Sequence, residues 1–383
     1  MMHINRTVRH LRPLKLCLVL ICVLASSFTL TSCSNQDEVT IGFIGGLSGR
    51  VSDLGGPARN GMLLAIEEAN QAGGINGKPI KTIIKDDKQS KSRAVKAVKA
   101  LIDKKVDAII GPVTSAMAVE VAPLATQAKT LMMAVTVTTN ELTGQDDYFL
   151  RGLAPTAAHA GEMAEYLYGK KGVKNFSAIY DLTNRAYSES WVSDFKARFE
   201  ELGGQSKNIL SFSSGIQEEL VPMAKQLLEN DPDIILFVTN AVDAAILAKL
   251  VRLQDPSALI GTSEWAGTER LIELAGKYIE GAIVPQYIDR ESTEESYRIF
   301  HKNYLDRFKQ EPGFSGVIAY NVTRVVLDRI KNKEKGKDLK EAILDQGSFA
   351  GVQGGVKFDK YGDANSKTYI TEVTNGQFVV TSK

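Results

Sequence analysis

Two rounds of alternation between apolar β-rich runs and helix-period segments fill most of this chain, and this rhythm constrains its fold more than any other feature. Alternation of this kind is typical of a parallel sheet covered by helices on both faces. The β-rich runs of the first round are residues 39–47, 80–85, 106–111 and 131–137. The first round therefore predicts one complete α/β lobe, in which the first long helix covers residues 57–71.

The same rhythm starts again after residues 149–155 and continues to about residue 284. Three more helices are expected between residues 292 and 344, and the chain should end in a hairpin around Asn375-Gly376, a pair that tolerates positive φ angles. Two α/β halves admit either two consecutive domains or interleaved lobes joined by several crossovers. In both arrangements a solute would bind where the carboxyl ends of the strands meet helix N-termini.

The N-terminal residues have the pattern of an export signal. Four basic residues and no acidic one accompany an apolar stretch at residues 14–24, which is too short for a transmembrane helix of roughly 20 apolar residues. Leu30-Thr31-Ser32-Cys33 resembles a bacterial lipobox. We therefore expect residues 1–32 to be a lipoprotein signal peptide, Cys33 to carry the lipid and residues 33–38 to form a tether. The alternative is a plain secretory signal with an incidental cysteine.

The expected mature chain is nearly neutral and contains one cysteine. Removing the signal lowers Lys+Arg from 46 to 42 against 45 Asp+Glu, and leaves Cys33 without a partner for a disulfide in the chain. This balance argues against nucleic acid as a partner, and any membrane contact should come from the lipid. About 350 residues exceed one usual core, which favours two domains.

Sequence signatures of catalysis are missing. The chain has no Gly-x-Ser-x-Gly nucleophile turn, no Gly-x-x-x-x-Gly-Lys phosphate loop and no His-Glu-x-x-His metal pair. Only His159 and His301 lie in the expected mature chain, and a single histidine on a helix is usually structural. We therefore predict a protein that is not an enzyme, with no catalytic residue, no metal and no cofactor.

Short motifs spread over nearly the whole mature chain carry a family resemblance. They are Ile41-Gly42, Ser48-Gly49, Gly55, Gly61, Glu67-Glu68-Ala69-Asn70, Ala72-Gly73-Gly74-Ile75-Asn76-Gly77, Asp86-Asp87, Ile109-Ile110-Gly111 and Asn140-Glu141-Leu142-Thr143. Together they resemble the leucine/isoleucine/valine-binding family of ABC-importer solute receptors. The resemblance implies the α/β type I periplasmic-binding fold, with two interleaved doubly wound lobes joined by three crossovers.

The resemblance also implies how the chain is divided between the lobes. Carried onto this sequence, the crossovers fall near residues 152–155, 285–288 and 351–355. Lobe one would then comprise residues 39–153 and 288–350, and lobe two residues 154–287 and 351–383. The functional motion would be closure of the two lobes over a solute, because ligand contacts favour the closed state.

In lobe one the resemblance gives ligand-binding roles to Ser115, Thr136 and Thr138. Ser115 stands where the family has a serine that holds the ligand's carboxylate at a helix start, and a helix N-terminus favours anions. The alternative is that Ser115 or Thr114 only caps this helix. Thr136 and Thr138 correspond to a backbone carbonyl and a hydroxyl that grip the ligand, although threonines are also good strand formers.

In lobe two Glu264 matches an acidic residue that pairs with the ligand's ammonium, a contact that separates amino acids from plain carboxylates. The alternative is an exposed loop residue. Tyr187 is close to a tyrosine that closes over the ligand, and Trp265 can supply an apolar wall or ordinary packing. Leu54 and Asn240 stand where the family has aromatic walls. A branched-chain ligand therefore does not follow from the resemblance.

These expectations describe an exported, membrane-anchored, monomeric receptor that is periplasmic or on the cell surface. It would capture an amino acid or a related small carboxylate and deliver it to an ABC permease. One alternative is a lipoprotein that presents its closed form to a membrane sensor. Another is a receptor for a carboxylate that is not an amino acid, such as an aromatic acid.

Overall fold

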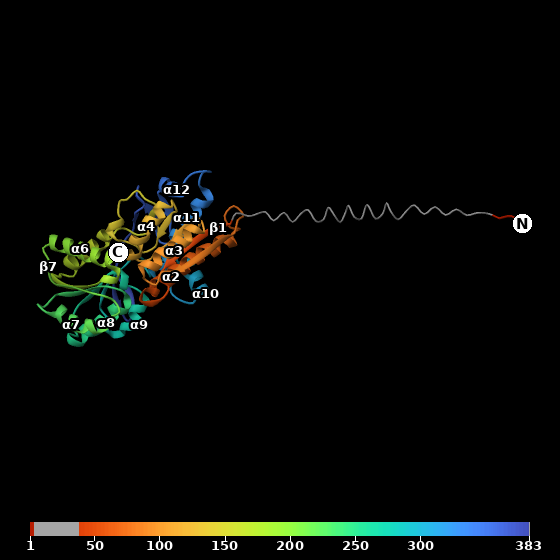
Figure 1. Ribbon diagram of the computed structural model, residues 1–383. Coiled ribbons are helices and arrows are strands. Elements are labelled where there is room, and N and C mark those ends of the chain that lie inside the picture. Colours follow the sequence, from red (N-terminus) through yellow and green to blue (C-terminus); the bar gives the residue numbers. More distant parts are fainter. Residues whose placement is uncertain (4–37, 383) are drawn as a thin grey trace. The chain divides into compact units, whose positions relative to one another are not determined.

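The computed structural model describes residues 1–3 and 38–382, and all of its helices and strands lie within residues 39–382 (Figure 1). The expected signal peptide and the lipidation site Cys33 fall on residues 4–37, outside the described residues. None of the described helices combines the length and the hydropathy that crossing a membrane requires.

The first lobe is built on a five-stranded parallel sheet in the order β2-β1-β3-β4-β5. Alternate residues of its buried strands face opposite sides, as expected for a sheet covered on both faces. On β3, Ile109 packs in one apolar cluster with α3 and α4, whereas Ala108 and Ile110 belong to the cluster of α2 and α11. The elements are β1 (Val39–Gly45), α2 (Ser52–Gln71), β2 (Ile80–Asp86), α3 (Lys91–Asp103), β3 (Ala108–Ile110), α4 (Ser115–Gln127), β4 (Met132–Ala134) and β5 (Phe149–Arg151).

Three later helices complete this lobe, namely α10 (Glu295–Phe308), α11 (Gly313–Asn332) and α12 (Leu339–Gln346). Helix α11 lies against α2. The two helices approach closely at Gly61, where a Cβ atom would stand 2.1 Å from the Gly316 carbonyl oxygen. Segments far apart in sequence therefore share one core.

The second lobe is built on a seven-stranded sheet in the order β15-β14-β10-β9-β8-β6-β7, in which only β14 and β15 are antiparallel to their neighbours. Its faces are again divided by alternation, since Leu236 packs with α5 and α6 and Phe237 with α7, α8 and α9. The elements are α5 (Thr156–Glu165), β6 (Asn175–Asp181), α6 (Arg185–Glu201), β7 (Gln205–Phe212), α7 (Gln217–Leu228), β8 (Ile234–Val238), α8 (Ala241–Gln254), β9 (Ile260–Thr262), α9 (Glu269–Ala275), β10 (Ile283–Gln286), β14 (Tyr369–Thr374) and β15 (Gln377–Ser382).

The chain passes between the lobes three times, because α10 to α12 return to the first lobe and β14 and β15 to the second. The fold class implied by the resemblance, two interleaved doubly wound lobes, is therefore confirmed. Residues 351–355 form the turn between β11 (Ser348–Ala350) and β12 (Gly355–Phe358), and β13 (Ala364–Asn365) completes a small third sheet. The sequence pattern did not predict this sheet, and the residue limits of the lobes remain a prediction.

Two local predictions have different outcomes. The hairpin turn at Asn375-Gly376 is confirmed, with φ angles of 52° and 69° between β14 and β15. The first long helix was predicted to begin at Pro57, but α2 begins at Ser52 and contains Pro57. Proline has a helical φ and lacks only the N–H donor, so this helix loses one backbone hydrogen bond and continues.

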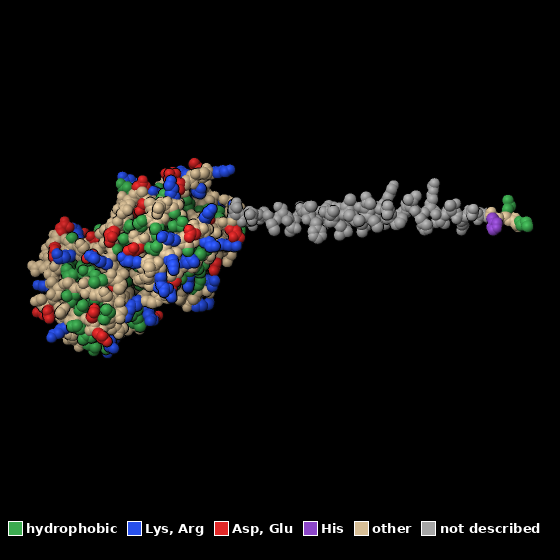
Figure 2. Space-filling view, in the orientation of Figure 1, with side chains coloured by type: hydrophobic (Ala, Val, Ile, Leu, Met, Phe, Trp, Pro, Cys, Tyr) green, Lys and Arg blue, Asp and Glu red, His purple; other side chains and the backbone are tan. Residues whose placement is uncertain are grey.

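On the face shown in Figure 2, Lys and Arg side chains are interspersed with Asp and Glu.

Candidate functional site

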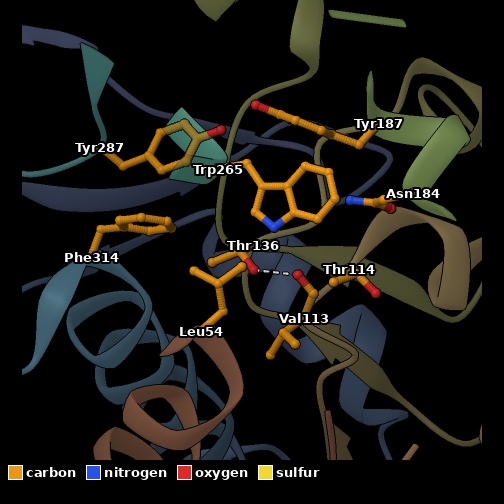
Figure 3. A pocket seen from close by; sticks show the side chains of 9 residues that line it. All are labelled: Leu54, Val113, Thr114, Thr136, Asn184, Tyr187, Trp265, Tyr287 and Phe314. Atoms are coloured by element: carbon orange, nitrogen blue, oxygen red, sulfur yellow. Dashed lines mark hydrogen bonds between the residues drawn. The ribbon is translucent and has the colours of Figure 1, made fainter. Parts of the chain in front are cut away.

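A cavity of about 260 Å³ lies between the two lobes, where the carboxyl ends of several strands meet. This volume includes space at the mouth of the cavity that is open to solvent. Figure 3 shows the nine lining residues, which come from both lobes. They are Leu54, Val113, Thr114, Thr136, Asn184, Tyr187, Trp265, Tyr287 and Phe314.

Glu264 begins the short 3-10 helix Glu264–Ala266, separated from the end of β9 by one residue, and is completely buried, so it is not an exposed loop residue. Its Oε2 atom accepts hydrogen bonds from the Tyr187 hydroxyl and from Trp191 Nε1, both at 3.0 Å. Its Oε1 atom has no hydrogen-bond partner within the described part of the chain. Burial raises the pKa of Glu264 to about 7, because removal from water disfavours the charged carboxylate. This side chain can therefore change its charge near neutral pH.

Ser115 and Thr138 lie together on the first lobe, and both are completely or almost completely buried. Ser115 is the first residue of α4, and its Oγ atom accepts long contacts of 3.4 Å from the backbone N–H groups of Thr138 and Thr139. The Thr138 hydroxyl has no partner among the residues described. Two hydroxyls and a helix start thus converge in a dry region.

The start of α4 is not capped by a side chain of its own. Thr114 occupies the N-cap position but donates its hydroxyl to Gln89 Oε1 at 2.9 Å. Instead, Asn184 Oδ1, from the second lobe, accepts a hydrogen bond from the Ala116 N–H at 2.9 Å. An acceptor from the opposite lobe therefore occupies one of the N–H donors that this helix terminus leaves outside its own hydrogen bonds.

Aromatic side chains form much of the cavity wall. Trp265 meets Tyr187 edge to face at 5.8 Å between ring centroids, and Tyr287 meets Phe314 at 5.3 Å. Leu54 lies below them, almost completely buried, and the Thr136 hydroxyl donates to the Val113 carbonyl (Figure 3). Of the residues predicted from sequence, Leu54, Thr136, Tyr187 and Trp265 therefore line the cavity. These aromatic rings can pack against an apolar or planar part of a solute.

Asn240 does not line the cavity. It is the N-cap of α8, where its Oδ1 atom accepts from the Val242 and Asp243 N–H groups and its Nδ2 atom donates to Asp243 Oδ2 at 2.7 Å. Tyr287 and Phe314 supply aromatic walls that were not expected from Leu54 and Asn240. Neither of these was predicted, and neither was Asn184. Tyr287 had one usable signal, since it directly follows the last parallel strand of the second sheet.

Buried polar atoms without a partner concentrate beside this cavity. Among the described residues nine buried side-chain nitrogen and oxygen atoms lack a hydrogen-bond partner, and five of them belong to Thr138, Thr262, Ser263, Glu264 and Trp265. An unpaired buried polar group costs about 1–3 kcal/mol, so such groups are rare without a reason. Four of the five belong to the consecutive residues 262–265, of which Trp265 lines the cavity, and Thr138 is two residues from the lining residue Thr136.

The lobes touch each other around the cavity. Arg50 Nη1 pairs with Asp243 Oδ1 at 2.6 Å, the Thr268 hydroxyl donates to Asp53 Oδ2 at 2.6 Å, and Asn140 donates to Asp194 at 2.7 Å. Burial raises the pKa of Asp53 to about 6. These contacts describe a closed arrangement of the lobes.

No group of three or more His, Cys, Asp or Glu residues is arranged to hold a metal within the described ranges 1–3 and 38–382.

Comparisons with known proteins agree with this geometry. A family model described as periplasmic binding protein matches residues 38–377. A Brucella melitensis protein described as Leu/Ile/Val-binding protein homolog 3 is 21% identical over 335 residues, which cover 87% of this chain and 90% of the relative.

Solved structures give the same result. The leucine binding protein LivK of Thermotoga maritima has a TM-score of 0.81 and 25% identity, with coverage of 90% of this chain and 98% of that chain. An ABC-transporter solute binding protein from R. palustris, in complex with benzoate, has a TM-score of 0.78 and 18% identity, with coverage of 90% and 96%. This chain therefore belongs to the periplasmic binding protein family, whose members are exported solute-binding receptors of ABC transporters and not enzymes.

Proposed function

We propose that this receptor captures a small α-amino acid between its lobes and delivers it to an ABC permease. The observation that carries the proposal is the unpartnered Oε1 atom of the completely buried Glu264. A carboxylate oxygen in a dry site needs a donor, and a ligand ammonium supplies one together with a compensating charge. The relatives described as leucine-binding proteins support this ligand class.

The ligand's carboxylate would lie on the opposite lobe. Ser115, the Thr138 hydroxyl and the start of α4 offer donors there, and the contact of Asn184 with the Ala116 N–H supports the use of this terminus by an acceptor. Thr136 and Tyr187 would complete the polar contacts, while Leu54 and Trp265 would contribute apolar wall. Asn240 would act indirectly, through its contact with Asp243. Carboxylate and ammonium would then each contact one lobe, and these contacts would favour the closed form.

The pH dependence of binding tests the role of Glu264. Its pKa is about 7 without ligand, and a neighbouring ammonium favours the ionised form, so the pKa falls in the complex and binding releases a proton. The apparent affinity for an amino acid should therefore weaken by up to about tenfold per pH unit below pH 7, and level off above it. Calorimetry from pH 5 to 9 measures this profile.

The matched variant is Glu264→Gln, which keeps the shape of the side chain and removes its charge. We expect amino-acid affinity to fall by about tenfold to a hundredfold, with the pH profile flattened and the fold intact by circular dichroism. Glu273→Gln, at an exposed position of α9, serves as the control and should behave like the wild type. Unchanged affinity of the Glu264 variant would contradict the ammonium role.

The second candidate ligand class is an aromatic carboxylate, favoured by the rings of Trp265, Tyr287 and Phe314 around the cavity and by the benzoate complex of the R. palustris protein. Such a ligand has no ammonium, so Glu264 would have to bind it in the protonated form. Affinity would then fall as the pH rises through 7, the opposite sign from an amino acid. A thermal-shift panel of amino acids, simple carboxylates and benzoate, repeated at pH 6 and 8, separates the two classes.

Delivery implies export and attachment beside a permease. We infer that residues 1–32 are removed, that Cys33 carries a lipid anchor and that residues 33–38 form the tether of a monomeric receptor. The mature protein should then fractionate with membranes, and Cys33→Ala should release it as a soluble form of unchanged ligand affinity. A release that also abolishes uptake of the ligand would favour transport. Retained uptake, with loss of a ligand response, would favour presentation to a membrane sensor.

A further inference from the structure

Trp265 carries a donor that the cavity does not use. The residue is 5% exposed, and its Nε1 atom is buried without a hydrogen-bond partner in the described part of the protein. Figure 3 shows the indole nitrogen directed toward Thr136 inside the cavity and not toward Tyr187. The Thr136 hydroxyl, which donates to the Val113 carbonyl, does not accept from it. The indole N–H has lost its hydration without compensation, and such donors usually find a partner.

Asn184 supplies a second donor at the same cavity. Its Oδ1 atom is engaged by the Ala116 N–H, and its amino group is not among the fully enclosed atoms that lack a partner. In Figure 3 this nitrogen faces the Trp265 ring. The other walls nearby are Leu54, Val113 and Phe314, which offer side-chain carbon only. Trp265 Nε1 is therefore the one lining donor that is both fully enclosed and without a partner in the described part of the protein, and the three apolar walls cannot accept its hydrogen bond.

We propose that the side chain of the bound amino acid carries an oxygen acceptor, which receives the Trp265 Nε1–H and the Asn184 amide. The ligand class is then a short polar amino acid with a side-chain hydroxyl or carboxamide, in place of a purely aliphatic branched chain. This proposal rests on the proposed function, because it assumes that the ammonium and carboxylate are held at Glu264 and Ser115. The small cavity agrees with a short side chain.

Selectivity should follow from the same geometry. A site built around hydrogen-bond donors rejects an isostere that lacks the acceptor, because the donors are then buried unpaired in the complex. Threonine and valine have nearly the same shape and differ by a hydroxyl in place of a methyl group. The intact receptor should therefore bind threonine at least about tenfold more tightly than valine. Asparagine and leucine form a second, larger pair.

Calorimetry of the wild type and of Trp265→Phe, with threonine and valine, tests the proposal. The variant keeps an aromatic wall and removes the N–H, so the threonine preference should shrink several-fold, mostly through weaker threonine binding. The ratio of two affinities in one preparation does not depend on the folded fraction. If the variant does not fold, two measurements on the wild type still decide the question. The wild type should bind threonine more tightly than valine, and asparagine more tightly than leucine.

Two results would overturn the proposal while leaving the amino-acid function intact. One is a wild type that binds valine or leucine as tightly as the polar partner. The other is an equal loss of threonine and valine affinity in Trp265→Phe, which would mean that the indole contacts the carboxylate shared by both ligands. Binding of benzoate or simple carboxylates without any amino acid would instead contradict the proposed function itself.

Discussion

At the scale of single residues, Arg151 is a buried charge outside the cavity whose partners should matter for stability. Arg151 is 0% exposed, and its guanidinium donates to Asp363 Oδ1 at 2.7 Å, to the Thr139 carbonyl and to the Thr143 hydroxyl. Removing one partner of a buried pair leaves the other charge without compensation. Asp363→Ala should therefore lower the free energy of unfolding by about 3–5 kcal/mol, measured by urea denaturation.

An exposed ion pair provides the control for this experiment. Lys171 and Glu372 are 2.8 Å apart with side chains 35% and 32% exposed, and solvent screens such a pair. Glu372→Ala should cost at most about 1 kcal/mol. Comparable losses in the two variants would show that burial of Arg151 is not what makes its pair important.

The candidate site residues illustrate what can be predicted at this scale. Ser115, Thr138 and Glu264 each stand in a short local motif, and all three are buried, although none lines the cavity itself and their binding roles stay a prediction. Tyr287 and Phe314 were missed because their position depends on how distant segments fold back, which no local motif records. Asn240 sits in a sequence that also fits a helix N-cap, and that is the role it has in the structure.

At the scale of elements, the contact between α2 and α11 depends on glycine. A Cβ atom at Gly61 would stand 2.1 Å from the Gly316 carbonyl oxygen, a backbone atom that cannot move without shifting its helix. Gly61→Ala should therefore destabilise the protein by about 1–3 kcal/mol despite the better helix propensity of alanine. Thermal unfolding by circular dichroism measures the loss.

Gly56, in the same helix, is the matched control. A Cβ atom there meets nothing within 4 Å, and the residue has no positive φ angle. Gly56→Ala should raise stability by up to about 1 kcal/mol, because alanine loses less backbone entropy on folding. If both variants change stability in the same direction, helix propensity and not the contact with α11 would control this region.

Elements were predictable where their signals are local. The hairpin at Asn375-Gly376 and most strands of both sheets have clear apolar runs and turn residues, and they appear where expected, but the edge strand β5 (Phe149–Arg151) was not predicted. The strands β11 to β13 are short and only partly buried, since β12 alternates exposed and buried residues over four positions. Strands this short do not show a clear alternation of apolar and polar residues in the sequence. Their side chains Phe349, Val356 and Phe358 pack into the apolar core, which depends on residues distant in sequence.

At the scale of the whole molecule, the sequence rhythm left two arrangements of the halves open, and long-range packing decides between them. His159 lies where the connecting segments meet. Its Nδ1 atom is 2.7 Å from the Thr368 hydroxyl, its Nε2 atom is 3.3 Å from the Ser366 hydroxyl, and its ring meets Tyr287 at 4.8 Å. Burial lowers the pKa of His159 to about 3, so the imidazole is neutral at the hinge. The alternation of apolar and polar residues along the sequence does not predict that these distant segments contact one another at His159.

Closure depends on contacts between the lobes. Three such contacts are described above, and of these three only the contact of Arg50 with Asp243 joins two charged side chains. Asp243 is completely buried in the closed arrangement and also accepts hydrogen bonds from Asn240 and Ser214, while Arg50 remains 29% exposed. Removing Arg50 leaves Asp243 with these other donors but takes away its counter-charge. Because an open protein must close before the ligand is held, a smaller closed population lowers the apparent affinity in proportion.

Arg50→Gln should therefore weaken ligand binding by about threefold to tenfold and increase the radius of gyration without ligand, measured by small-angle scattering. Saturating ligand should restore the compact form, since the variant changes the balance between states and not the cavity. Arg185→Gln removes an arginine that pairs with Glu189 inside α6 and should leave both quantities unchanged. An Arg50 variant with weaker binding but an unaltered radius would place its effect in the cavity, and would contradict its role in closing the lobes.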